Sequence, residues 1–167
     1  MASFEEHINQ AKNNLAFLSK VNETSQSQWD WQVTISFYSA LHLINAHIAI
    51  TAEHHYRSHE AVNNAISPFN QTSIVKLTEE LYTSYMKLQN LSRRARYLCH
   101  EDPSNKAVNA HPIYDKHFAK SIYHLDKIIS FVSAKYDIKF DKLPLSCIEF
   151  KNKKFSNFSI KAETILK

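Results

Sequence analysis

The chain contains no glycine, whereas an average protein contains about 7 %. Glycine takes positive φ angles most readily, so tight hairpins and phosphate-cradling loops that depend on it are excluded. Neither a P-loop nor a GxGxxG dinucleotide-binding turn is present. A chain of 167 residues without glycine is most simply a set of helices joined by polar residues and proline.

Composition indicates an ordinary globular domain. Hydrophobic residues make up 44 % of the chain and charged residues 22 %. Residues 1–6 do not have the form of a secretory signal, and no uninterrupted apolar run is long enough to cross a bilayer. Cys99 and Cys147 form no CxxC pair, which is typical of a reducing compartment and gives no zinc signature. We therefore expect a soluble cytoplasmic protein with no cofactor, no metal and no membrane partner.

Apolar residues recur at helical spacing along most of the chain. Ser3 and Glu6 have the form of a capping box at the start of the first helix. The segment 28–51 is apolar on more than one face, which is typical of a central helix. The pattern predicts helices over residues 4–22, 28–51, 59–67, 73–99 and 112–136. The expected fold class is all-α, a five-helix up-down bundle formed by residues 1–137.

The last thirty residues differ from the rest of the chain in charge and in residue pattern. Residues 1–137 carry 13 basic and 13 acidic side chains, so the net charge of +4 arises entirely from residues 138–167. Segments 138–140 and 148–150 alternate apolar and charged residues, which favours short strands or an extended arm. We expect this basic, apolar-rich extension to pack on the bundle, on a second subunit or on a partner.

The segment 91–102 carries the residues best suited to chemistry. On a helix, Arg93, Arg96, Tyr97 and His100 form one outward stripe, Arg94 lies on its flank, and Leu91 and Ala95 face the opposite side. A guanidinium binds phosphate in a bidentate way, and an imidazole acts as a general acid or base near neutral pH. Cleavage of RNA through its own 2′-hydroxyl needs only these two roles. A solvated basic face near a helix C-terminus explains the arginines equally well.

Two stretches together resemble the HEPN family. Ser36-Phe37-Tyr38-Ser39-Ala40-Leu41-His42 is similar to its "YYAxxH" helix, and the stretch from Leu88 to Glu101 is similar to its second signature, which ends in the R-x4-6-H motif. The resemblance covers residues 4–136. It implies a helical bundle that forms a homodimer and cleaves RNA without metal, often as a toxin or in antiviral defence.

The resemblance also implies site residues, with the arginine left open. His100 falls on the catalytic histidine, while both Arg93 and Arg94 satisfy the allowed spacing to it. Arg96 and Tyr97 would line the RNA-binding groove. The commonest family spacing would place Ala95 at the arginine position, and Asp102 stands where some family toxins carry a modified tyrosine. The alternative is a catalytically inactive HEPN-like module that binds a nucleotidyltransferase antitoxin or a defence complex.

Other clusters favour simpler interpretations. His54, His55 and His59 are spaced as metal ligands could be, but solvated loop histidines are the preferred interpretation. His42 and His47 lie on the apolar second helix and are expected to be buried and hydrogen-bonded. The aromatic residues expected in the core rather than on a base-stacking platform are Trp29, Trp31, Phe37 and Tyr38.

Overall fold

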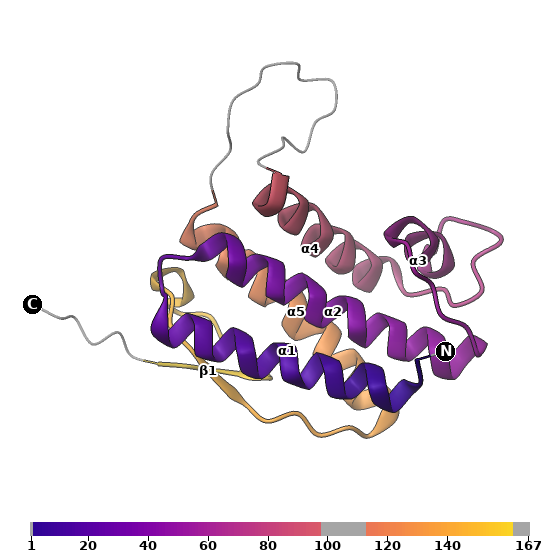
Figure 1. Ribbon diagram of the computed structural model, residues 1–167, viewed down its shortest axis with the longest axis horizontal. Coiled ribbons are helices and arrows are strands. Elements are labelled where there is room, and N and C mark those ends of the chain that lie inside the picture. Colours follow the sequence, from indigo (N-terminus) through magenta and orange to yellow (C-terminus); the bar gives the residue numbers. More distant parts are fainter. Residues whose placement is uncertain (1, 98–112, 162–167) are drawn as a thin grey trace, which may run out of the picture.

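The computed structural model describes residues 2–97 and 113–161 as a bundle of helices with a short sheet beside it (Figure 1). Five α-helices occur in this part of the chain: α1 (Phe4–Thr24), α2 (Trp29–Ala52), α3 (His59–Ile66), α4 (Glu79–Tyr97) and α5 (Asp115–Tyr136). Helix α2 packs against α1, α4 and α5 and is the central helix. The expected helical bundle and its central helix are therefore confirmed.

The central helix is buried over most of its surface. By length and composition α2 would also satisfy the criteria for a membrane span, but 72 % of its apolar window is buried inside the bundle. Its core side chains include Val33, Phe37, Leu43, Ile44 and Ile48, all fully enclosed. The apolar character of α2 is thus accounted for by the core of the bundle.

The first helix begins with the expected capping box. The Ser3 hydroxyl accepts a hydrogen bond from the Glu6 N–H at 3.1 Å, and the Glu6 carboxylate accepts one from the Ser3 N–H at 2.7 Å. These bonds satisfy two N–H groups that the helix itself leaves unpaired. The apolar face of α1 then buries Ile8, Ala11, Leu15 and Leu18 against α2 and the extension.

The fourth helix starts later than the sequence pattern predicted. The expected start at residue 73 is wrong, because α4 begins at Glu79. The preceding segment is irregular, and the N–H groups of Val75 and Leu77 donate to the carbonyls of Ala65 and Ile66 at the end of α3. Both side chains are buried although neither is helical. The backbone of this segment therefore donates hydrogen bonds to carbonyls at the end of α3 and does not form a first turn of α4.

Two helices end in left-handed residues that are not glycine. Glu53 follows α2 with φ 49°, Asp137 follows α5 with φ 52°, and Asn152 has φ 63° in the extension. The N–H of Asp137 donates to the Ser133 carbonyl, as in a helix terminated by glycine. Acidic and amide residues thus perform in this chain the turns that glycine usually makes.

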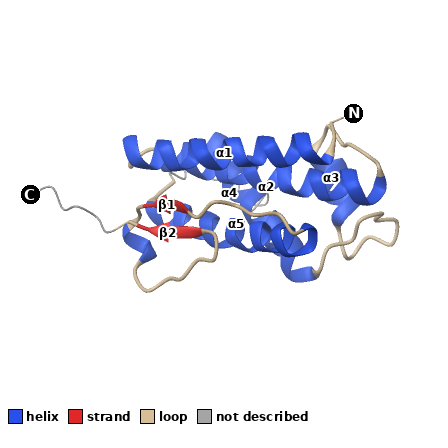
Figure 2. Cartoon of the chain, turned by 90° about the horizontal axis from the view of Figure 1, so that it is seen from below, coloured by secondary structure: helices blue, strands red, loops and turns tan. Residues whose placement is uncertain are grey.

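The extension packs on the bundle through a small parallel sheet (Figure 2). Strand β1 (Leu143–Leu145) pairs with β2 (Phe158–Ile160), and the 3₁₀-helix η1 (Ile148–Phe150) lies between them in the chain. Of the two alternatives for segments 138–140 and 148–150, short strands are wrong, since the pairing residues lie elsewhere and 148–150 forms η1. Five extension side chains join the core cluster of the helices: Leu145, Cys147, Phe150, Phe155 and Phe158. The extension does contain short strands, so the expectation of a β-like extension is confirmed, although not for the expected residues.

Buried polar contacts hold the extension in place. Asn22 of α1 donates to the Ser146 carbonyl at 2.9 Å and accepts from the Ser146 N–H at 2.7 Å. At the other side, the Asp126 carboxylate of α5 accepts from the N–H groups of Ser156 and Asn157. The extension is therefore attached to both α1 and α5.

Candidate functional site

Three of the four arginines in the chain lie at the C-terminal end of α4. Arg93 and Tyr97 are exposed, Arg94 and Arg96 are half-buried, and Leu91 and Ala95 are buried. This pattern confirms that Arg93 and Tyr97 face outward and that Leu91 and Ala95 face the core, whereas Arg96 of the predicted stripe is only partly exposed. His100 lies outside the described residues, so the structure does not position the predicted catalytic histidine.

The arginine side chains diverge into different surroundings. On an ideal helix Arg94 and Arg96 point about 160° apart. Arg94 lines a pocket against α5, whereas Arg96 lines a pocket against α2. The structure therefore brings Arg96 and Tyr97 together, and it does not gather the three arginines of one chain at a single point.

Arg96 is held between two tyrosine rings. Its Nη1 donates to the Tyr38 hydroxyl at 3.3 Å, and its Nε donates to the Ser92 carbonyl at 3.4 Å. The guanidinium carbon lies 5.7 Å from the centre of the Tyr38 ring and 5.0 Å from that of Tyr97. Cation–π attraction and the two hydrogen bonds fix the guanidinium plane between α2 and α4.

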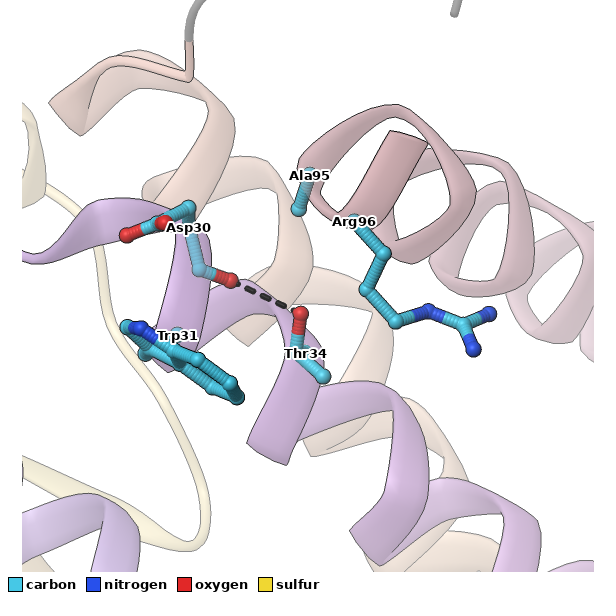
Figure 3. A pocket seen from close by; sticks show the side chains of 5 residues that line it. All are labelled: Asp30, Trp31, Thr34, Ala95 and Arg96. Atoms are coloured by element: carbon cyan, nitrogen blue, oxygen red, sulfur yellow. Dashed lines mark hydrogen bonds between the residues drawn. The ribbon is translucent and has the colours of Figure 1, made fainter. Parts of the chain in front are cut away.

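A small pocket separates the start of α2 from the end of α4 (Figure 3). It has a volume of about 170 Å³ and is lined by Asp30, Trp31, Thr34, Ala95 and Arg96. The Thr34 hydroxyl donates to the Asp30 carbonyl at 2.9 Å, so it belongs to the helix wall. In Figure 3 the Arg96 guanidinium points away from Asp30, and the aliphatic part of its side chain forms the wall.

Trp31 lies at the surface and not in the core, where it was expected. It is 60 % exposed at the edge of this pocket, so its assignment to the core is wrong. Trp29 instead faces inward and stacks on Phe118 with ring centres 5.5 Å apart. Residues two positions apart on a helix point about 160° apart, so only one of the two tryptophans could face the core. The two-residue spacing of the tryptophans could therefore have shown from the sequence that one of them is exposed.

His59 also belongs to this region. Its ring lies 5.3 Å from that of Phe37 and 6.3 Å from that of Tyr38, which is the ring that contacts Arg96. Burial, and then the positive charge of Arg96, lowers the pKa of His59 below its usual value. The imidazole is therefore neutral at pH 7 beside the Arg96 site.

A second and larger pocket, the α4–α5 pocket, lies on the other side of α4. It has a volume of about 440 Å³ and is lined by Lys87, Leu91, Arg94, His117, Lys120, Tyr123 and His124. Burial, followed by the nearby Lys127, Lys87 and Lys120, lowers the pKa of His124 to about 4. Among the described residues that line this pocket, two are lysines and one is an arginine, and none is acidic.

The histidines do not form a metal site in the described part of the chain. No group of three His, Cys, Asp or Glu side chains there could hold a metal ion. His55 faces His7, while His54 packs on Tyr56 with ring centres 4.4 Å apart. His47 contacts the Tyr136 hydroxyl, as expected for a buried histidine on the central helix. Cys147 is buried, and Cys99 lies outside the described residues.

Comparison with known proteins adds no relative. No protein-family model matches the chain, and neither a curated protein nor a solved structure matches it significantly. The class of protein that the structure defines is therefore a helical bundle with a parallel two-stranded extension, and function is argued from the site alone.

Proposed function

We propose that this protein is a HEPN-type endoribonuclease that cleaves RNA without a metal ion, in the manner of a toxin or defence nuclease. The observation that carries the proposal is the contact between Tyr38 and Arg96. Tyr38 belongs to the stretch that resembles the "YYAxxH" helix, and Arg96 belongs to the stretch that resembles the second family signature. A functional relationship between the two motifs requires that they meet in space.

The electrostatics of this end of the bundle support RNA binding. The first turn of α2 lines the Arg96 pocket, and His117 in the first turn of α5 lines the pocket that contains Arg94. The N-terminus of a helix carries about half a positive charge. We infer that these two helix N-termini, with Arg96 in one pocket and Arg94 in the other, attract phosphate groups of an approaching RNA strand.

The proposed mechanism uses two protein groups. His100 takes the proton from the 2′-hydroxyl, and the freed oxygen attacks the adjacent phosphorus and expels the 5′-oxygen, which receives that proton from His100. Arg93 or Arg94 holds the scissile phosphate and stabilises the charge that develops on it. Arg96 and Tyr97 line the groove. A homodimer in the cytoplasm would bring two such sets together across its axis.

The test is cleavage of a labelled, structured RNA in the presence of EDTA. Wild type is compared with His100→Ala and with Arg93→Ala/Arg94→Ala, and Arg57→Ala is the matched control, since Arg57 is an exposed arginine outside α4. We expect cleavage by the wild type and the control, and its loss in the two site variants. Equal cutting by all four proteins would reveal a contaminant and refute the proposal.

A second function is favoured by exposed aromatic side chains. Trp31 is 60 % exposed and Tyr97 is 66 % exposed at the same end of the bundle. Large amphipathic aromatics are enriched among residues that dominate protein interfaces. The alternative is thus a catalytically inactive HEPN-like module that binds a protein such as a nucleotidyltransferase or a second copy. A folded wild type that cuts no RNA, and a dimer that Trp31→Ala/Tyr97→Ala converts to monomer in light scattering, would favour it.

A further inference from the structure

The α4–α5 pocket has the chemistry of an anion site, separate from the Arg96 pocket. We propose that it binds phosphoryl groups, with Lys87 and Lys120 as the charged contacts and His124 as a hydrogen-bonding group in its wall. Lys87 stands on α4 and Lys120 on the facing helix α5, and both side chains are exposed at the pocket. Two ammonium groups on opposite walls can contact different oxygens of one phosphate.

Lys87 and Lys120 differ from a neighbouring lysine in their ion pairs among the described residues. Another lysine on α5, Lys127, forms an ion pair with Glu80 of α4 at 2.6 Å. No ion pair joins Lys87 or Lys120 to a carboxylate within residues 2–97 and 113–161. In the part of the chain that the structure describes, the interface of α4 with α5 therefore has an ion pair at Lys127 and none at Lys87 or Lys120, so an external anion can bind these two lysines.

The walls of the pocket suit a phosphoryl group attached to a base. His124 is half-buried, and its Nδ1 lies 3.3 Å from the Ser84 hydroxyl. The low pKa of His124 keeps it neutral at pH 7, so one ring N–H is available as a donor. Tyr123 lines the same pocket and is 48 % exposed, which offers a ring face for stacking. The volume of about 440 Å³ is in the range of small-molecule sites.

The phosphoryl group could come from an RNA strand or from a free mononucleotide. An RNA source would extend the proposed nuclease groove along the strand, because Arg94 lines this pocket as well. The inference does not require cleavage, since none of its three residues performs chemistry. It therefore remains testable if His100 proves to have no catalytic role.

The experiment measures binding of three probes to the full chain: inorganic phosphate, AMP and a short 2′-O-methyl oligouridine. The last probe lacks a free 2′-hydroxyl and cannot be cut by the proposed route, which separates binding from cleavage. Wild type is compared with Lys87→Gln/Lys120→Gln. The matched control is Lys12→Gln/Lys135→Gln, which changes the charge equally at two exposed lysines outside the pocket. Lys87→Arg/Lys120→Arg retains the charge, and circular dichroism verifies that each variant is folded.

We expect the glutamine variant to bind roughly tenfold more weakly than wild type, while the control and the arginine variant bind normally. For the oligouridine, loss of two phosphate contacts should also reduce the slope of log affinity against log salt by about 1.4. Oligouridine binding far tighter than AMP identifies a strand, and comparable binding identifies a mononucleotide. Absence of binding to all three probes, or equal binding by the glutamine variant and its control, overturns the inference.

Discussion

The Nδ1 atom of His7 lies 3.1 Å from the Nδ1 atom of His42, in a contact that joins α1 to α2. The other ring nitrogen of His7, Nε2, lies 3.2 Å from Nδ1 of His55. Each contact needs one nitrogen that donates and one that accepts, so the three rings satisfy each other only while they are largely neutral. Burial, and then the charges of His42 and His55, lowers the pKa of His7 to about 4.

This cluster predicts that the protein loses stability in mild acid. In the unfolded chain His7 takes up a proton near pH 6.5, whereas in the folded state it does so only near pH 4. Its contribution to the free energy of unfolding should therefore be complete above pH 6.5 and fall as the pH decreases from 6.5 to 4. We expect a loss of about 1–2 kcal/mol from this residue, measured by urea unfolding at successive pH values.

The matched comparison for this prediction is His7→Gln against His54→Gln. Glutamine at residue 7 does not titrate, so the variant should lose part of the acid dependence. His54 is exposed and does not belong to the cluster, so its substitution should leave the pH dependence unchanged. Identical pH profiles for both variants would contradict the role given to His7.

Asn22→Ala should detach the extension from α1. The Asn22 side chain is buried, and its amide also donates to the Gln32 side chain at 2.8 Å. Removing it leaves the backbone N–H and carbonyl of Ser146 without their partner inside the protein. We expect the free energy of unfolding to fall by roughly 2–4 kcal/mol. Asn13→Ala, at an exposed position of the same helix, should change it by less than about 0.5 kcal/mol.

Phe150→Ala tests whether the extension belongs to the core. The Phe150 ring is 1 % exposed and lies between the rings of Phe118 and Phe155, at 5.7 and 5.2 Å. A cavity at this place should cost about 3–5 kcal/mol in chemical denaturation. Ile148 belongs to the same 3₁₀-helix but is 47 % exposed, so Ile148→Ala should be much milder. Equal effects would show that the extension contributes little to the core.

Trp31→Ala should affect RNA binding without affecting the fold. Because its ring is exposed, we expect a change in unfolding free energy of less than about 0.5 kcal/mol. If the proposed function is right, loss of a stacking ring should weaken binding of single-stranded RNA by about 1–3 kcal/mol. Phe17→Ala removes a similarly exposed ring, 55 % accessible on α1, and should leave the affinity unchanged. Fluorescence anisotropy with labelled RNA measures the RNA affinity of both variants, and urea unfolding measures their stability.

The sequence predicted helices best where the apolar period was long and a cap was present. The capping box at Ser3 and the apolar face of α1 lie where the pattern placed them. The start of α4 could not be predicted in this way, because Ile74 and Leu77 fit helical spacing, whereas the backbone of Val75 and Leu77 pairs with the end of α3. That choice depends on a tertiary contact, which local periodicity does not contain.

The candidate site was predictable in part. Helical geometry correctly separated the exposed Arg93 and Tyr97 from the buried Leu91 and Ala95. It could not show that Tyr38 would reach Arg96, because that contact spans 58 residues and depends on how α2 packs on α4. The α4–α5 pocket was missed for the same reason, since Lys87 and Lys120 come together only through the packing of two helices.

The left-handed residues Glu53, Asp137 and Asn152 have a consequence for the unfolded chain. A left-handed conformation costs roughly 1–2 kcal/mol for a residue with a Cβ atom, and glycine at these positions would relieve that strain. Glycine would also enlarge the number of conformations open to the unfolded chain, which opposes the gain. Because the chain has no glycine, these three turns are strained in the native state. For the same reason the unfolded chain has less backbone entropy to lose when the protein folds.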